Sequence, residues 1–199
     1  MCSRNNRFTD NIVSIAASTG GPDALSVILS SLNEKFPCPI VIAQHITDGF
    51  VTGMVEWLKG ICRLKVKVAA DGEPLVAGTA YISRSEKHMV INNSKQISFL
   101  DRSPKDIYRP SCDALLTSVA SVYGPKSIGI ILTGMGTDGV LGMKKIKEAG
   151  GLTISQDEKS SVVFGMPKAA IDSGCIDRVL PLGEISIELE RLIGKGILV

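Results

Sequence analysis

The sequence predicts an α/β fold: a doubly wound, mainly parallel sheet with helices on both faces and a short antiparallel β insertion or edge. Three observations support this prediction. Short apolar runs end at Gly, Ser, Asp or His residues, amphipathic stretches follow them, and the middle of the chain holds closely spaced β-rich runs separated by turn residues.

The first part of the chain alternates strands and helices. A continuous apolar run, Ile12–Ala17, is the first predicted strand, and the small residues Ser18–Gly21 end it. Pro22 suits the first turn of the helix that follows. Pro39–Gln44 is the second predicted strand, and a helix over about 50–59 comes after it.

The middle of the chain is expected to supply the antiparallel part of the fold. Turn residues such as Asp71-Gly72 separate four short β-rich runs there. These runs are Leu64–Val68, Thr79–Ser83, His88–Asn92 and Ile97–Asp101.

After Pro110 the alternation of helices and strands resumes. The predicted elements are a helix over 113–123, a strand over 128–132, a helix ending near 149, a strand over 152–156, a short helix from 167 and a last helix over 185–193. One domain is therefore expected over residues 11–199, with residues 1–10 as an N-terminal tail or linker remnant.

Composition excludes several classes of protein. The 199 residues include 22 Lys and Arg against 20 Asp and Glu, so the formal net charge of +2 argues against a basic nucleic-acid groove and a polybasic membrane patch. No apolar stretch reaches the length of a membrane helix, and the first ten residues are polar. We expect a cytoplasmic protein that binds no nucleic acid and does not insert into a membrane.

The five cysteines are scattered and form no pairs at metal-binding or disulfide spacing. They are expected to be small buried apolar residues in a reducing compartment, and Cys112 is the one plausible thiol nucleophile. His45 and His88 lie 43 residues apart without a second ligand at helical spacing, so no metal site is predicted.

The loop after the first predicted strand carries a candidate nucleophile. Ala16-Ala17-Ser18-Thr19-Gly20 resembles the G-x-S-x-G nucleophile elbow, with Ala16 in place of the first glycine. Such a strand-to-helix turn exposes a serine hydroxyl and directs helix N–H groups at an anion. The alternative is that Ser18 or Thr19 only caps the next helix.

A general base follows the second predicted strand. His45 has the side chain whose pKa suits proton transfer near neutral pH, and adjacent strands can bring it close to Ser18. His88 is the competing base, but it begins a strand in the antiparallel region, away from the carboxyl-end crevice.

The glycine-rich loop Gly134–Gly139 allows two interpretations. Its spelling is G-x-G-x-x-G, with Asp157 18 residues beyond, which is the pattern of a dinucleotide-binding oxidoreductase. In a hydrolase, the same glycines let N–H groups approach an oxyanion, and Asp138 orients the histidine. Asp48 is the rival for that orienting role.

Seven motifs taken together resemble the catalytic domain of CheB-type protein-glutamate methylesterases of bacterial chemotaxis. In chain order they are Ile15–Gly21, Gln44-His45, Asp71–Glu73, Lys87–Met89, Arg109–Ser111 with Asp113, Ile131–Gly136 with Asp138-Gly139, and Val162–Pro167. The resemblance covers roughly residues 11–194.

The resemblance implies a serine esterase that removes γ-methyl esters from glutamates of chemoreceptor cytoplasmic helices, releases methanol and also deamidates receptor glutamines. It implies Ser18 as the nucleophile, His45 as the base and Asp138 as the orienting carboxylate, with no metal or organic cofactor. The backbone N–H groups of Met135 and Thr19 are the oxyanion candidates.

The resemblance also implies a role for Arg109 in docking the receptor, or in helix entry beside Pro110, and a packing role for Met166-Pro167. Family members usually carry a receiver domain before this domain, so a receiver is an expected partner if the chain is a fragment. Tyr108 replaces an expected histidine, and Asp48-Gly49-Phe50 replaces a proline-rich turn. The alternatives kept open are the nucleotide-dependent oxidoreductase and a receptor-binding module without activity.

Overall fold

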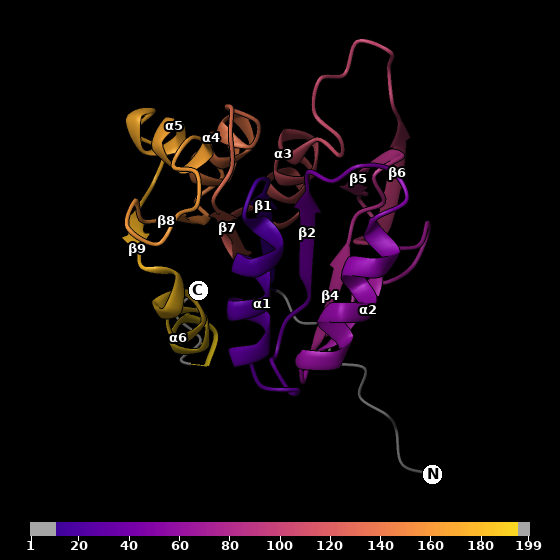
Figure 1. Cartoon of the computed structure of the whole chain (residues 1–199), viewed down its shortest axis with the longest axis horizontal. Helices are drawn as coiled ribbons and strands as arrows, with labels where there is room; N and C mark the ends of the chain where they lie inside the picture. The colour runs from indigo at the N-terminus through magenta and orange to yellow at the C-terminus, as the bar shows by residue number, and fades with distance from the viewer. Residues whose placement is uncertain (1–10, 195–199) are drawn as a thin grey trace.

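Seven parallel strands form the central sheet of the computed structural model, which describes residues 11–194 (Figure 1). Their order in the sheet is β3-β4-β2-β1-β7-β8-β9. The strands are β1 Ile12–Ala17, β2 Ile40–Gln44, β3 Lys65–Val68, β4 Thr79–Ile82, β7 Ser127–Ile131, β8 Leu152–Gln156 and β9 Arg178–Leu180. The tail expected at residues 1–10 lies outside the described residues.

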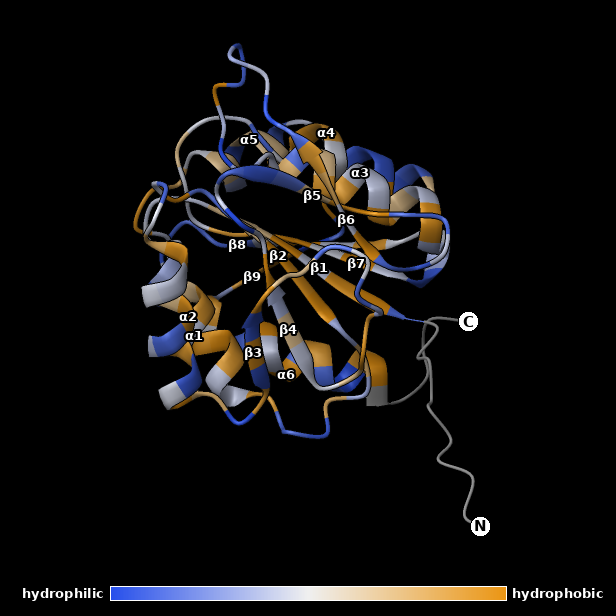
Figure 2. Cartoon of the chain, turned by 90° about the vertical axis from the view of Figure 1, so that its right-hand side faces the viewer, coloured by the Kyte–Doolittle hydropathy of each residue, from blue (hydrophilic) through white to orange (hydrophobic). Residues whose placement is uncertain are grey.

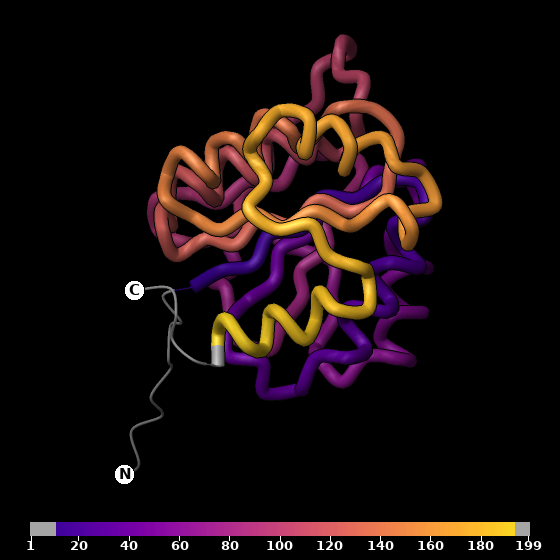
Figure 3. Tube along the Cα trace, turned by 90° about the vertical axis from the view of Figure 1, so that its left-hand side faces the viewer, coloured from indigo at the N-terminus to yellow at the C-terminus, as the bar shows by residue number. Residues whose placement is uncertain are grey.

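Helices cover both faces of the sheet, as predicted. One layer holds α1 Gly21–Ser31, α2 Val51–Ile61 and α6 Leu182–Gly194, and the other holds α3 Cys112–Tyr123, α4 Val140–Glu148 and α5 Met166–Asp172. Figure 3 shows α6 in yellow and α5 in orange on opposite sides of the sheet. None of the helices in the described part of the chain is long and apolar enough to cross a membrane.

Alternation along the buried strands creates two cores. In β1, Val13 and Ile15 pack under α1 and α6, whereas Ile12 and Ala16 pack under α3 and α4. Figure 2 shows these apolar strands between helix layers whose outer sides are more polar. A sheet buried on both faces explains why β1 is a continuous apolar run.

The antiparallel part is smaller than predicted. The hairpin of β5 Lys87–Ile91 and β6 Ile97–Asp101 is antiparallel and packs beside α3, but β3 and β4 are parallel strands of the main sheet. A loop over 69–78, not a helix, returns the chain from β3 to β4. The carboxylate of Glu73 holds this loop by accepting hydrogen bonds from the Ala70 N–H (2.7 Å) and the Lys67 ammonium (2.5 Å).

The sheet changes direction at its centre. From β1 the chain builds outward through β2 and β4 on one side, and later through β7, β8 and β9 on the other. α1 leaves β1 on one face, and α4 follows β7 on the opposite face. The loops after β1 and β7 therefore lead to helices on opposite faces, and they contact each other at the carboxyl ends of the strands, where open α/β sheets bind ligands.

Candidate active site

Ser18 follows β1 with its backbone fixed on both sides. Its N–H donates to the Thr133 carbonyl (3.0 Å), and its own carbonyl accepts from the Gly21 N–H (2.8 Å). The N-cap of α1 is Gly20, at φ 78°, and no side chain caps this helix. Within residues 11–194 the half-buried Ser18 hydroxyl forms no hydrogen bond. The helix-cap alternative for Ser18 and Thr19 is thus not what the structure has.

Gln44 joins the Ser18 loop to His45. Its buried side-chain Nε2 donates to the Ser18 carbonyl and to the His45 carbonyl, each at 2.8 Å. The His45 N–H also donates to the Ala17 carbonyl (2.9 Å). These bonds hold the ends of β1 and β2 in one register, so Ser18 and His45 start from neighbouring positions.

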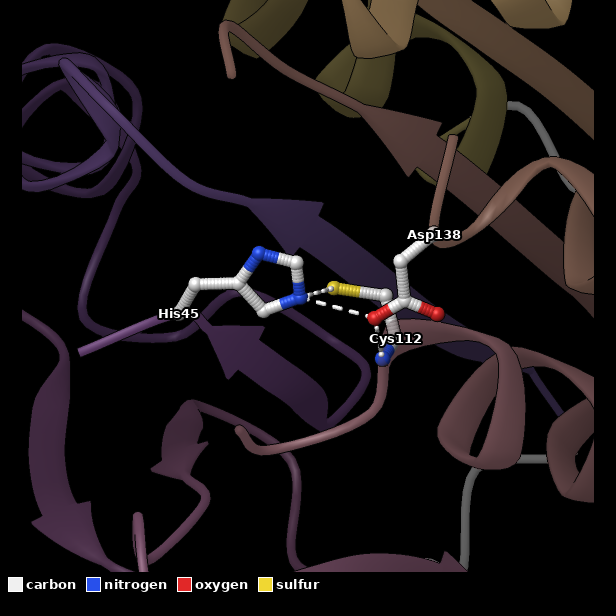
Figure 4. Close-up of side chains that lie close together, drawn as sticks. All are labelled: His45, Cys112 and Asp138. Atoms are coloured by element: carbon white, nitrogen blue, oxygen red, sulfur yellow. Dashed lines mark hydrogen bonds and ion pairs between the residues drawn. The ribbon is translucent and has the colours of Figure 1, made fainter. Parts of the chain in front are cut away.

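His45 and Asp138 are in direct contact. The Nε2 atom of His45 lies 2.7 Å from Oδ2 of Asp138 (Figure 4). The figure also shows Nδ1 turned away from the carboxylate. Tyr108 stacks on the imidazole with ring centroids 5.1 Å apart and an interplanar angle of 13°. The ring is therefore held at its edge by Asp138 and on one face by Tyr108.

The carboxylate of Asp138 is nearly fully buried, at 3% exposure, and accepts several hydrogen bonds besides that of His45. The N–H groups of Cys112 (2.7 Å) and Asp113 (3.0 Å) donate to it, as does the Ser111 hydroxyl (3.4 Å). Burial raises the pKa of Asp138, but the hydrogen bonds from His45 and from the two N–H groups outweigh burial, and the net pKa lies below its usual range. Asp138 is held as a carboxylate that can orient an imidazole.

Asp113 mirrors this arrangement. Its Oδ1 atom accepts from the N–H groups of Gly139 (2.9 Å) and Gly142 (2.8 Å) at the start of α4. Burial raises the pKa of Asp113, and the negative charge of Asp138 adds to the rise, against the lowering effect of these N–H groups. Asp113 thereby fixes the loop that carries Asp138.

Cys112 lies inside the same cluster. Its thiol is fully buried, with Sγ 3.4 Å from Nε2 of His45 and 3.5 Å from the Ala43 carbonyl oxygen. Burial, and secondarily the charge of Asp138, raises the pKa of this thiol well above its usual value. A protonated sulfur with no exposed surface for a carbonyl substrate to approach is a poor nucleophile, so the structure disfavours the thiol alternative.

The rival base and the rival orienting acid are engaged elsewhere. The ring of His88 accepts at Nδ1 from the Ser111 N–H and contacts Asp106 through Nε2, both at 2.9 Å. Asp48 forms a bidentate pair with Arg102, at 3.0 and 3.1 Å, and the hydrogen bond from Arg102 is the main reason its pKa is lowered. Both side chains thus have partners outside the contact between His45 and Asp138.

The glycines of the Gly134–Gly139 loop face protein atoms. A Cβ at Gly134 would overlap Cβ of Ser18, and a Cβ at Gly136 would meet the hydroxyl of Tyr108. Asp157, the acid of the dinucleotide-binding pattern, accepts hydrogen bonds from the backbone N–H and the hydroxyl of Ser160. The glycines that match the dinucleotide-binding pattern therefore allow the loop to pack closely against Ser18 and Tyr108.

The two oxyanion candidates are Thr19, which follows Ser18 in the chain, and Met135, which follows the glycine that packs against Ser18. Thr19 is exposed, as is Met135, and among residues 11–194 neither backbone N–H donates a hydrogen bond. Thr133, which sequence analysis assigned no role, ties their loops together. Its hydroxyl donates to the Thr19 carbonyl (2.9 Å) and accepts from the Val163 N–H (2.9 Å).

A cavity of about 680 Å³ opens beside His45. Exposed Phe50, Ile107 and Arg109 line it, together with Tyr108. The Arg109 carbonyl accepts from the Ile46 N–H (3.2 Å), and the Arg109–Pro110 peptide bond is cis. Arg109 therefore combines a fixed backbone with an exposed side chain at the cavity.

Met166 and Pro167 are buried, as expected for packing residues. The Met166 N–H donates to the Gly134 carbonyl (2.8 Å), and the Gly134 N–H donates to the Val163 carbonyl (3.0 Å). These hydrogen bonds from the segment 163–166 hold Gly134 in place next to Ser18.

Comparisons with known proteins show which proteins this chain resembles. The sequence profile of the CheB methylesterase family matches residues 13–189. A protein-glutamate methylesterase/protein-glutamine glutaminase of Paramagnetospirillum magneticum is 52% identical over 186 residues, which cover 94% of this chain and 52% of the relative. One of Carboxydothermus hydrogenoformans is 50% identical over 184 residues, covering 89% of this chain and 54% of the relative.

Among solved structures, the crystal structure of the Thermotoga maritima CheB methylesterase catalytic domain matches with a TM-score of 0.88 and 38% sequence identity. The match covers 93% of this chain and 100% of that domain. The chain spans about half the length of the two relatives described above.

Proposed function

Because the chain belongs to the CheB methylesterase family, we propose that it hydrolyses γ-methyl esters of glutamate side chains and releases methanol. We extend the proposal to deamidation of glutamines, since the two relatives named above carry both activities in their names. The substrates proposed are glutamates and glutamines on the cytoplasmic helices of chemoreceptors, which places the protein in the cytoplasm, in chemotactic adaptation.

One observation carries the proposal: the contact of 2.7 Å between His45 and the buried carboxylate of Asp138, at the strand end next to Ser18. A serine hydroxyl is a weak nucleophile until a base removes its proton. An ionised carboxylate at one edge of the imidazole favours the tautomer with the proton on that edge. The other nitrogen is then an acceptor.

This arrangement assigns a role to each imidazole nitrogen. With the proton on Nε2 directed at Asp138, Nδ1 accepts the proton of the Ser18 hydroxyl. The roles of the two nitrogens are exchanged relative to chymotrypsin-type proteases, in which the carboxylate bonds to Nδ1. Stacking by Tyr108 keeps the ring from turning away from this position.

In the first half of the reaction, Ser18 Oγ attacks the ester carbonyl carbon while His45 takes the hydroxyl proton. The oxyanion of the tetrahedral intermediate accepts hydrogen bonds from the N–H groups of Thr19 and Met135. The bond to the methoxy group breaks, and His45 returns the proton to release methanol. For a glutamine substrate the leaving group is ammonia.

In the second half, a water molecule attacks the acyl-enzyme. His45 removes a proton from the water, the same N–H groups stabilise the second oxyanion, and the proton returns to Ser18 as the glutamate is released. No step requires a metal or an organic cofactor. We propose that Arg109 docks the receptor helix at the cavity beside His45, next to the apolar side chains of Phe50 and Ile107.

Release of methanol and ammonia from methylated and amidated receptor membranes tests the activity. We expect both products from the wild-type chain. Binding of receptor membranes without either product would instead favour a receptor-binding module. NAD(P) binding together with absence of product would favour the oxidoreductase interpretation of the Gly134–Gly139 loop.

A further inference from the structure

The cluster around His45 has the composition of a metal-binding site. Among the described residues, His45, Cys112 and Asp138 form the one group of at least three His, Cys, Asp or Glu side chains whose ligand atoms all lie within 4.8 Å of one another. Figure 4 shows the imidazole Nε2, the thiol sulfur and a carboxylate oxygen converging on one point. The spacings of 67 and 93 residues between these ligands leave no local signature, and this is why the sequence predicted no metal site.

The ligand types match a particular class of cation. Imidazole nitrogen, thiolate sulfur and carboxylate oxygen are the three ligands that Zn²⁺ takes in proteins. On binding, the Cys112 thiol releases its proton to solvent, and the resulting thiolate and the Asp138 carboxylate together neutralise the charge of the divalent cation. Mg²⁺ and Ca²⁺ prefer oxygen ligands and do not suit a site with sulfur and nitrogen.

His45 Nε2 lies closer to the other two ligand atoms than tetrahedral zinc requires, and the sulfur and the carboxylate oxygen lie within 4.8 Å of each other. Bond lengths near 2.1 Å to nitrogen and oxygen and 2.3 Å to sulfur place ligand atoms roughly 3.4 Å apart for the N–O pair and roughly 3.6 Å apart for the N–S pair. In the structure the separations are 2.7 Å between His45 Nε2 and Asp138 Oδ2, and 3.4 Å between His45 Nε2 and Cys112 Sγ. A cation that replaces the shared proton needs the imidazole to move by less than about 1 Å.

We propose that His45, Cys112 and Asp138 bind Zn²⁺, and that the bound ion inhibits the hydrolase. The inhibitory part rests on the proposed function, whereas binding does not. A neutral imidazole that binds a metal through Nε2 carries its proton on Nδ1. Nδ1 then cannot accept the proton of Ser18, and Asp138 no longer orients the ring. A single ion therefore blocks both actions of the base.

Access to the site is from the side of His45, whose side chain is 12% exposed beside the cavity of about 680 Å³, whereas Asp138 is 3% exposed. Cys112 and Asp138 lie deeper, and the Cys112 N–H stays bonded to Asp138. The ligands are thus held by backbone contacts before the ion arrives. Such preorganisation favours a defined one-to-one site over loose surface binding.

Binding is tested with Co²⁺ as a spectroscopic substitute for Zn²⁺, and with Zn²⁺ in competition against a chromophoric chelator. The variants are Cys112→Val and Cys112→Ser, and the control is Cys62→Ser, which removes a free thiol on the other face of the sheet. We expect the wild type and the control to bind one ion per chain with a thiolate-to-cobalt absorption band. The Cys112 variants should lose the band and bind Zn²⁺ at least about 10- to 100-fold more weakly.

A measurement on the wild type alone guards against variants that fail to fold. Zn²⁺ should raise its unfolding temperature, and Mg²⁺ at the same concentration should not. Absence of the cobalt band in the wild type, or equal Zn²⁺ affinity in Cys112→Val, overturns the site.

The inhibitory part is tested by methanol release. Zn²⁺ should abolish release by the wild type and by Cys62→Ser at one equivalent, and Cys112→Val should require at least about tenfold more metal. Full release by the zinc-loaded wild type overturns inhibition. If the metal-free chain releases no methanol while the cobalt band is present, the proposed function fails and the metal site stands.

Discussion

Asp113 and Asp138 accept hydrogen bonds from each other's helix. Asp113 lies at the start of α3, Asp138 lies just before α4, and each carboxylate accepts from the first N–H groups of the opposite helix. Asp138, just before α4, accepts from the N–H groups of Cys112 and Asp113 in α3, and Asp113 accepts from those of Gly139 and Gly142 at the start of α4. Unpaired N–H groups at helix starts favour negative charge. The exchange locks the two helices together and fixes the carboxylate that contacts His45.

This exchange predicts opposite pH trends for two amide variants. The pKa of Asp138 is lowered in the folded chain, so its carboxylate stabilises the fold above the ordinary value of 3.8, and this stability is lost as pH falls through the lowered pKa. The pKa of Asp113 is raised in the folded chain. Ionisation of Asp113 therefore lowers the free energy of unfolding as pH rises from 3.8 through the raised pKa.

In urea unfolding, Asp138→Asn should therefore cost more stability at pH 7 than at pH 3. Asp113→Asn keeps an oxygen acceptor for the α4 N–H groups. Its free energy of unfolding, relative to that of the wild type, should be higher at pH 7 than at pH 3. Trends of the same sign in the two variants would contradict the account.

The activity of the same aspartate variants identifies the orienting acid. Asp138→Asn is expected to lower kcat on the order of 10⁴-fold, by analogy with the serine-protease triad, because the amide stabilises the wrong tautomer of His45. Asp48→Asn should remain within about tenfold of the wild type, since Asp48 pairs with Arg102. Methanol release under saturating substrate measures both. A near-wild-type kcat of Asp138→Asn together with a strongly lowered kcat of Asp48→Asn would instead identify Asp48 as the orienting acid.

Gln44 is predicted to be a positioning residue. Gln44→Met keeps the side-chain volume but leaves the Ser18 and His45 carbonyls without their buried donor. We expect a loss of about 1–3 kcal/mol in unfolding free energy and a fall in kcat of about 10- to 100-fold, because small misplacements of reacting groups cost this much.

The matched control for Gln44→Met is Gln96→Met, in the turn of the β5–β6 hairpin. It should leave kcat and stability unchanged. Equal effects of the two substitutions would show that Gln44 does not position the catalytic groups.

Gly134→Ala tests the close approach of the glycine-rich loop to the nucleophile. The added Cβ would lie 2.6 Å from Cβ of Ser18, so either the loop or Ser18 must shift. Activity should fall by about 100-fold or more. Gly53→Ala, in α2 where a Cβ meets open space, should keep full activity and gain up to about 1 kcal/mol. A fully active Gly134→Ala would refute the packing argument.

Much of the fold follows from local patterns. The predicted bounds of β1 and β8 match the structure, because each segment begins with an apolar residue after a polar or glycine residue and ends before a polar one. The runs that form β3 and β4 were predicted to be antiparallel, and this was wrong: the two strands pair in parallel, because short β-rich runs on either side of Asp71-Gly72 suit a hairpin equally well. β9 was missed, because three residues at a sheet edge carry almost no pattern.

In the candidate site, too, some residues were predicted from local patterns and others were not. Ser18, His45 and Asp138 were predicted from their places after strands, and the structure brings His45 and Asp138 into contact. The roles of Gln44 and Thr133 depend on their side chains reaching loops 26 and 114 residues away, respectively. Such contacts leave no spacing rule in the sequence, so only the fold reveals them.

The most direct test of the account compares methanol release from methylated receptor membranes by the wild type and Ser18→Ala. We predict that kcat falls on the order of 10⁴- to 10⁶-fold in the variant, because the nucleophile is removed while the fold and the oxyanion N–H groups remain. Equal release from the two proteins would contradict the serine mechanism.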